Sequence, residues 1–90
     1  MAKNFTIVVW AKDGCSYCAE VKEYLTEQQL DFKIVDVTNH DDYRDILELK
    51  YGVRHVPVVE IGRDHQYRAI TEVGIENLQI VLQEANEVFN

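Results

Sequence analysis

The sequence predicts one α/β domain in which a mixed four-stranded sheet is flanked by helices. The first observation is a continuous apolar run, Thr6-Ile7-Val8-Val9-Trp10, whose β-branched and aromatic residues suit a strand covered on both faces. The second is a set of amphipathic segments at helical spacing. The third is the order strand, helix, strand, helix, strand, strand, helix. Two helix-connected strands followed by a hairpin imply one mixed sheet.

The segment after the first strand predicts a helix over about residues 16–29, since apolar side chains recur there at spacings of three and four: Cys18, Val21 and Leu25. Residues 31–37 are β-branched and bounded by polar residues, which indicates the second strand. Thr38-Asn39 then offers an N-cap for a second helix whose first turns are rich in Asp. Gly52 ends that helix.

The second half of the chain predicts a hairpin and a final helix. Residues 56–61 and 67–70 read as strands, and the polar segment 62–66 between them reads as the turn. The final helix begins at about Ile75 and carries the most regular apolar stripe of the chain: Leu78, Val81, Leu82, Ala85, Val88 and Phe89.

Length and charge exclude several classes of protein. The 90 residues fit a single domain, residues 1–90, with the composition of a folded globule. The formal net charge of −7 argues against binding to nucleic acid or to a membrane surface. The apolar run near the N-terminus is too short for a signal peptide or a spanning helix. We therefore expect a monomer of the reducing cytoplasm.

The chemistry is carried by Cys15-Ser16-Tyr17-Cys18, placed where a helix follows a buried strand. Unpaired N–H groups and the helix dipole favour the thiolate of Cys15, and the three-residue offset lets Cys18 attack a mixed disulfide formed there. Two small buried cysteines without a redox role are the simpler alternative. A zinc site is disfavoured, because the histidines lack ligand spacing and the chain has no second C-x-x-C.

Three segments of the chain resemble the glutaredoxin family. They are the stretch from Lys12 to the cysteine pair, His55-Val56-Pro57, and Val73-Gly74-Ile75-Glu76-Asn77-Leu78. Residues 51–57 are also similar to thioredoxins. The resemblance covers essentially the whole chain. It implies a thioredoxin fold of order β-α-β-α-β-β-α and a thiol-disulfide oxidoreductase that carries electrons in cell redox homeostasis.

The resemblance also implies roles for particular residues. Cys15 would be the nucleophile and Cys18 the resolving thiol, with a cis Val56–Pro57 bond that exposes the backbone of Val56 to an extended substrate. The residues implied to hold glutathione, as reductant or co-substrate, are Lys12, Tyr17, Arg44, Val56, Gly74, Ile75 and Glu76. Lys12 and Arg44 would meet its glycyl carboxylate. The start of the last helix would receive its γ-glutamyl carboxylate. Val73 and His55 depart from the family's Gly and Thr.

Other functions stay open beside reduction of protein disulfides or glutathionylated proteins. One is a redoxin recharged by thioredoxin reductase that serves ribonucleotide reductase, although Val8 and Val9 leave no carboxylate where thioredoxins keep a buried Asp. Another is a non-catalytic carrier of an iron–sulfur cluster, since some glutaredoxins with Cys-Ser-Tyr-Cys hold one between two protomers. A third is an inert adaptor that uses an acidic last helix. No resident metal is expected.

Overall fold

The computed structural model describes residues 5–63, 66–71 and 75–89, and within these ranges the predicted order of elements is confirmed. The elements in chain order are β1 (Thr6–Ala11), α1 (Ser16–Glu27), β2 (Lys33–Asp36), α2 (Asp41–Tyr51), β3 (Val58–Arg63), β4 (Gln66–Ile70) and α3 (Ile75–Phe89). No helix in the described ranges combines the length and the apolar character needed to cross a membrane.

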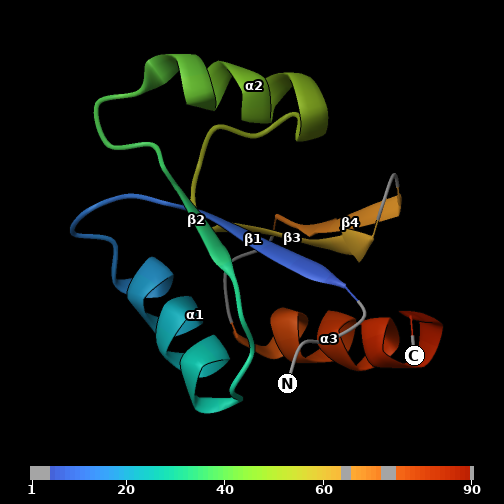
Figure 1. Ribbon diagram of the computed structural model, residues 1–90. Helices are drawn as coiled ribbons and strands as arrows, with labels where there is room; N and C mark the ends of the chain where they lie inside the picture. The colour runs from blue at the N-terminus through green and yellow to red at the C-terminus, as the bar shows by residue number, and fades with distance from the viewer. Residues whose placement is uncertain (1–4, 64–65, 72–74, 90) are drawn as a thin grey trace.

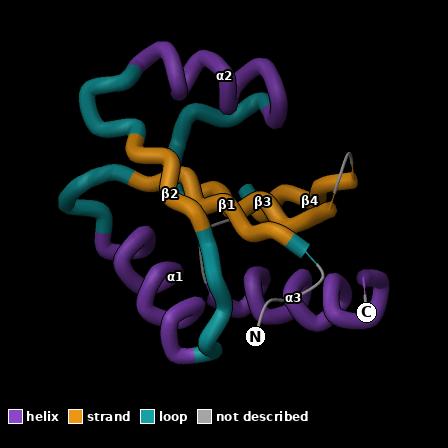
Figure 2. Tube along the Cα trace, in the orientation of Figure 1, coloured by secondary structure: helices purple, strands orange, loops and turns teal. Residues whose placement is uncertain are grey.

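The strands form one mixed sheet in the order β2-β1-β3-β4. β1 runs parallel to β2 and antiparallel to β3, with Val9 opposite Ile34 on one side and Val59 on the other. β4 continues the sheet as the hairpin partner of β3. Helices α1 and α3 cover one face, and α2 covers the other (Figures 1 and 2). A parallel pair needs a crossover connection, and α1 supplies it between β1 and β2.

Each face of the sheet has its own hydrophobic core, because successive side chains of a strand point to opposite faces. The larger core lies against α1 and α3 and includes Ile7 and Val9 of β1. The smaller core lies under α2 and consists of Trp10, Val37, Leu47 and Val58. The apolar run of β1 is therefore buried on both sides, as its sequence predicts.

Several element boundaries differ from the sequence prediction. α1 ends at Glu27, two residues early, and Gln29 adopts a positive φ of 58°. β2 is limited to Lys33–Asp36 and lies at the edge of the sheet, with mostly exposed side chains. β3 begins at Val58 rather than at residue 56, because Pro57 has no N–H to donate to a ladder.

The predicted N-cap of α2 is wrong. The cap position is His40, which makes no side-chain capping bond, and the preceding Asn39 has a left-handed φ of 60°. The hydroxyl oxygen of Thr38 is instead used by the turn that follows β1. The other end of α2 is as predicted: Gly52 adopts a φ of 74°, which suits a residue without Cβ, and donates its N–H to the carbonyl of Glu48.

Candidate active site

The two cysteines meet at the N-terminal mouth of α1. Cys15 is the N-cap residue, and Cys18 lies one turn inside the helix with no exposed surface. They are joined as a disulfide with a Cα–Cα distance of 5.2 Å, within the usual range for such bonds. The backbone N–H of Cys18 donates a 3.1 Å hydrogen bond to Sγ of Cys15. Cys15 is half-buried as a residue while Cys18 is fully buried, so Cys15 is the cysteine open to a substrate.

The turn between β1 and α1, residues 12–14, sets the position of Cys15. Gly14 has a φ of +74°, a left-handed conformation that glycine adopts without strain. One residue earlier, the N–H of Asp13 donates a 2.9 Å hydrogen bond to Oγ1 of Thr38 in the connection between β2 and α2. The approach to the nucleophile is therefore tied to a segment 25 residues away.

The segment before β3, residues 53–57, lies beside this site, and we call it the proline loop. Its Val56–Pro57 peptide bond is cis, and Pro57 is buried. Val56 packs against the same core cluster as Cys15, and so does Ile75 at the start of α3. The mouth of α1, the proline loop and the start of α3 consequently converge on one end of the larger core.

Hydrogen bonds hold the proline loop from both sides. From α2, Nη1 of Arg44 donates to the carbonyl of Arg54 at 3.2 Å. On the side of β4, Nε2 of His55 in the loop lies 2.6 Å from the carbonyl oxygen of Thr71 at the end of that strand. A carbonyl only accepts, so this contact requires the proton on Nε2. His55, which departs from the family's Thr, thereby links the loop to the segment leading into α3.

The side chains predicted to hold glutathione lie around this site but make different contacts. Lys12 and Tyr17 are exposed, with 51% of Tyr17 accessible. Arg44 is half-buried and already bound to the proline loop. In the first turn of α3, Ile75 is half-buried and Glu76 is exposed, while Gly74 lies outside the described residues. The assignment of these groups to glutathione stays a prediction.

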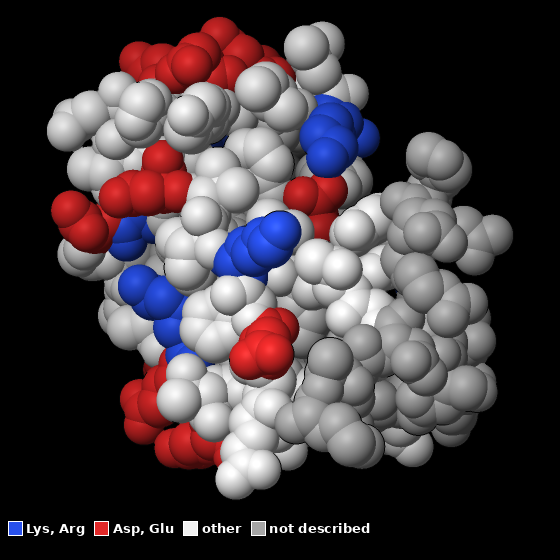
Figure 3. All heavy atoms as spheres, viewed as in Figure 1, with Lys and Arg blue, Asp and Glu red and all other residues white. Residues whose placement is uncertain are grey.

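Charge is distributed unevenly over the surface. Figure 3 shows acidic side chains gathered over α2, which carries four exposed carboxylates: Asp41, Asp42, Asp45 and Glu48. Arg54 is paired with two of them, at 2.6 Å to Asp45 and 3.2 Å to Glu48. Its positive charge is therefore compensated by acidic side chains of α2. Over the described parts of the chain, no group of three or more His, Cys, Asp or Glu could hold a metal ion.

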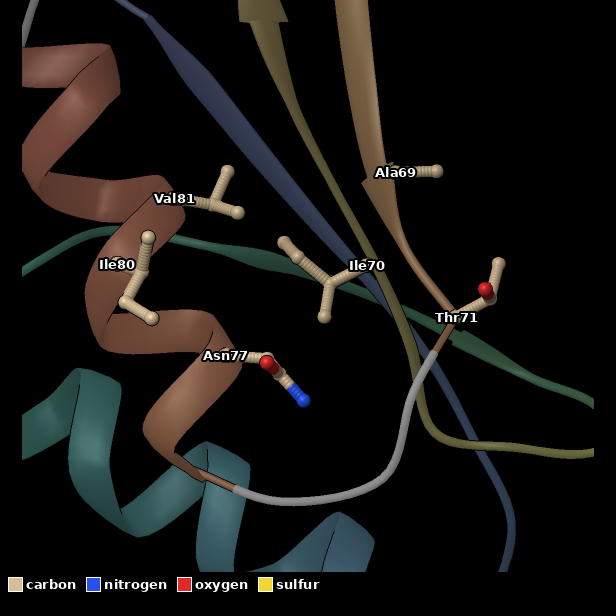
Figure 4. A pocket seen from close by; sticks show the side chains of 6 residues that line it. All are labelled: Ala69, Ile70, Thr71, Asn77, Ile80 and Val81. Atoms are coloured by element: carbon tan, nitrogen blue, oxygen red, sulfur yellow. The ribbon is translucent and has the colours of Figure 1, made fainter.

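A small pocket of about 170 Å³ opens between β4 and α3. Figure 4 shows Ile70 of β4 and Val81 of α3 pointing toward one another across it, with Thr71 at the end of the strand. None of the residues predicted for the active site lines this pocket. It adjoins the proline loop through Thr71, whose carbonyl contacts His55.

A buried carboxylate on the α2 face escaped the sequence analysis. Glu60 of β3, with only 8% of its side chain exposed, accepts hydrogen bonds from three donors. Nε1 of Trp10 lies 2.6 Å from Oε1, Nζ of Lys50 lies 2.8 Å from Oε2, and the hydroxyl of Tyr51 also donates to Oε2. The available signal was a lone Glu inside the apolar run Val58-Val59-Glu60-Ile61.

The pKa values of this cluster follow from burial and hydrogen bonding. Burial alone would raise the pKa of Glu60, but the bonds from Lys50, Tyr51 and Trp10 outweigh it and hold that pKa below its ordinary value. Burial, followed by the neighbouring Glu60 carboxylate, raises the pKa of Tyr51. Glu60 is therefore ionised and Tyr51 neutral at physiological pH, and the cluster links α2, β1 and β3.

A redox-active cysteine pair at a helix mouth, beside a cis-proline loop on a four-stranded mixed sheet, defines the class of thiol oxidoreductases with a thioredoxin-like fold. The Glutaredoxin family model matches residues 7–66 of this chain. The protein therefore belongs to the glutaredoxin family.

Relatives and solved structures agree with this placement. An N-acetyl-S-hydroxy-L-cysteine reductase of Bacillus subtilis (strain 168) is 58% identical over 82 residues, covering 91% of this chain and 88% of the relative. A glutaredoxin of Vernicia fordii is 35% identical over 68 residues, covering 72% and 65%. The crystal structure of the thioredoxin-like protein BC3987 matches with a TM-score of 0.68 and 27% identity, covering 84% of this chain and 99% of that one. A buckwheat glutaredoxin–glutathione complex, 17% identical with a TM-score of 0.64, shares the fold, over 91% and 72% of the two chains.

Proposed function

We propose that the protein reduces disulfides of proteins and mixed disulfides with glutathione through a dithiol cycle at Cys15 and Cys18. The observation that carries the proposal is the asymmetry of the pair. Cys15 is a half-buried residue at the helix mouth, whereas Cys18 is fully buried one turn inside. Only Cys15 can meet a substrate from solution, and Cys18 can react only with a group already attached to Cys15.

The cycle begins with the reduced dithiol. The thiolate of Cys15, stabilised by the N–H of Cys18 and by the positive end of the α1 dipole, attacks one sulfur of the substrate disulfide. A new S–S bond forms at Cys15, and the other substrate sulfur leaves as a thiolate that takes up a proton. Cys18 loses its proton and attacks Cys15. The second substrate thiol leaves, and the Cys15–Cys18 disulfide remains.

The rest of the site supplies recognition in this proposal. The backbone of Val56 pairs with an extended substrate in this proposal, and Lys12 and Arg44 attract the carboxylate of the glutathione glycine. Tyr17, Gly74, Ile75 and Glu76 complete that contact around the mouth of α1 and the start of α3. The protein acts as a monomer in the cytoplasm, where glutathione or thioredoxin reductase restores the dithiol.

A second candidate substrate is favoured by the Bacillus subtilis relative, whose name states that it reduces N-acetyl-S-hydroxy-L-cysteine. An S-hydroxy cysteine is a sulfenic acid, and the same two thiols suffice to reduce it. Cys15 would attack its sulfur and release the hydroxyl as water. Cys18 would then displace N-acetylcysteine. The two candidates share the enzyme chemistry and differ only in the group that leaves first.

The test supplies each substrate to the reduced protein and follows the products by mass spectrometry. Titration with glutathione disulfide should give an adduct on Cys15, followed by the Cys15–Cys18 bridge. Turnover is then compared with glutathione plus its reductase and with thioredoxin reductase alone, and release of N-acetylcysteine from its S-hydroxy form is measured in parallel. An adduct on Cys18, or no bridge with any substrate, would refute the proposal.

A further inference from the structure

Thr38 makes its contacts with the active-site turn rather than with the helix that follows it in sequence. Its Oγ1 accepts the 2.9 Å hydrogen bond from the N–H of Asp13, two residues before Cys15. It does not cap α2, whose cap position is His40. The side chain therefore connects two loops that enter the same end of the sheet.

Thr38 is itself held in place by the end of β2. Its backbone N–H donates to Oδ1 of Asp36 at 2.9 Å, and the N–H of Val37 donates to the carbonyl of Ala11 at 2.8 Å. The hydrogen bonds of Thr38, first through its side chain and then through its backbone, lower the pKa of Asp36. The chain of bonds therefore runs from Asp36 through the backbone of Thr38 to its side chain, and from there to the turn.

The turn needs such support, because its own interactions do not fix it. Lys12, Asp13 and Gly14 are all exposed, and Gly14 adds conformational freedom directly before the nucleophile. The stabilisation of a thiolate at a helix N-terminus depends on its distance from the first N–H groups, and it decays within the first turn. A small displacement of Cys15 would therefore change its chemistry.

We propose that Thr38 is a positioning residue for the thiol oxidoreductase reaction, which holds Cys15 at the mouth of α1 by fixing the N–H of Asp13. The inference rests on the proposed role of Cys15 as the attacking thiolate. Thr38 does not touch the substrate or the reacting sulfur, and it acts through the backbone of the turn. Without its hydroxyl, Cys15 would leave the N–H of Cys18 more often, and its thiolate would be less favoured.

The experiment compares Thr38→Val, which removes only the hydroxyl at nearly constant shape, with Thr38→Ser, which keeps it. Thr26→Val is the matched control, because the Thr26 hydroxyl also makes one hydrogen bond to backbone, to the carbonyl of Lys22, but near the far end of α1. The readouts are the titration of the Cys15 thiolate in the reduced protein and its rate of alkylation by iodoacetamide. Exchange of the Asp13 amide with deuterium is measured by NMR, and Lys12 and Asp13 are unchanged in every variant.

The rate of alkylation at neutral pH should fall roughly threefold to tenfold in T38V. A change of that size corresponds to the net free energy of one hydrogen bond. In T38V, the Cys15 thiol should also titrate at higher pH, and the Asp13 amide should exchange faster with deuterium. In T38S and T26V, both measurements should stay near their wild-type values. Unchanged titration and alkylation of Cys15 in T38V, even with reduced stability, would overturn the inference. Thr38→Ala replaces Thr38→Val in the same measurements if Val does not fit at this position. Alkylation of Cys18 before Cys15 in the wild type would instead refute the proposed function.

Discussion

The indole N–H of Trp10 donates a 2.6 Å hydrogen bond to the carboxylate of Glu60, directly beneath α2. These residues lie on neighbouring strands of the sheet and 50 positions apart in sequence. Lys50 and Tyr51, at the C-terminal end of α2, donate to the other oxygen of the same carboxylate. The buried carboxylate of Glu60 thus joins β1 and β3 to α2, the helix that leads into the proline loop. Its removal should weaken the contacts between these three elements.

Glu60→Ala should destabilise the protein by about 2–3 kcal/mol, because it leaves three donors without their shared acceptor. The loss is smaller than for a fully enclosed ion pair, since the side chain of Lys50 is 45% exposed and can turn to water. Urea unfolding measures this loss of stability. Glu27→Ala is the control, because Glu27 is exposed. Trp10 is the only Trp of the chain, so its emission should also change in the folded variant. Equal stability of the two variants would contradict this role for Glu60.

The same carboxylate predicts a pH dependence of stability. The folded-state pKa of Glu60 lies below the ordinary value of 4.5, so its stabilising contribution is complete above that pH. It is lost as pH falls through the lower folded-state pKa, where the carboxylate takes up a proton. Urea unfolding of wild type and Glu60→Gln from pH 7 to about pH 3 should show their difference shrinking at the acidic end. A constant difference in stability would mean that the ionised carboxylate of Glu60 is not the source of the stabilisation.

The sequence predicted the fold and the cysteine site for physical reasons that are local. The apolar run of β1, the stripe of α1 and the turn glycine Gly52 act on their own neighbours, so their structure follows from pattern. What escaped prediction depends on partners distant in sequence. Thr38 has the residue type of an N-cap, and only the fold shows that the N–H of Asp13 is its donor. Glu60 is a lone charged residue in an apolar run, and only the fold brings Lys50 and its other partners beside it.

His55→Ala should weaken substrate binding more than it slows the chemical steps. The ring holds the proline loop to the carbonyl of Thr71, and its loss frees a segment that lies beside Cys15 without altering either thiol. We expect KM for a disulfide substrate to rise roughly threefold to tenfold, as for loss of one positioning hydrogen bond, with a smaller change in kcat. His40→Ala is the control, because that exposed ring stacks on Tyr43, outside the proline loop. A fall in kcat alone would assign His55 to the chemistry instead.

Cys18→Ser should halt the cycle at the mixed disulfide, because the buried position then carries no thiol to attack Cys15. Incubation with glutathione disulfide should leave a stable adduct on Cys15, seen as the added mass of one glutathione. Cys15→Ser should give no adduct, since the remaining thiol is fully buried. If the single-cysteine variant that retains Cys15 turns over freely, Cys18 is dispensable and the reaction proceeds by a monothiol route.

Gly14 and Gly52 have the same φ of 74°, and at neither would an added Cβ meet any atom within 4 Å. Replacement by Ala therefore costs backbone energy alone, about 1–2 kcal/mol at each position. The two variants should lose similar stability in urea unfolding. They should differ in function, because Gly14 directly precedes Cys15 while Gly52 ends α2. We expect slower alkylation of Cys15 in Gly14→Ala and a rate near wild type in Gly52→Ala. Equal rates in both would show that the turn tolerates a change of backbone without moving the nucleophile.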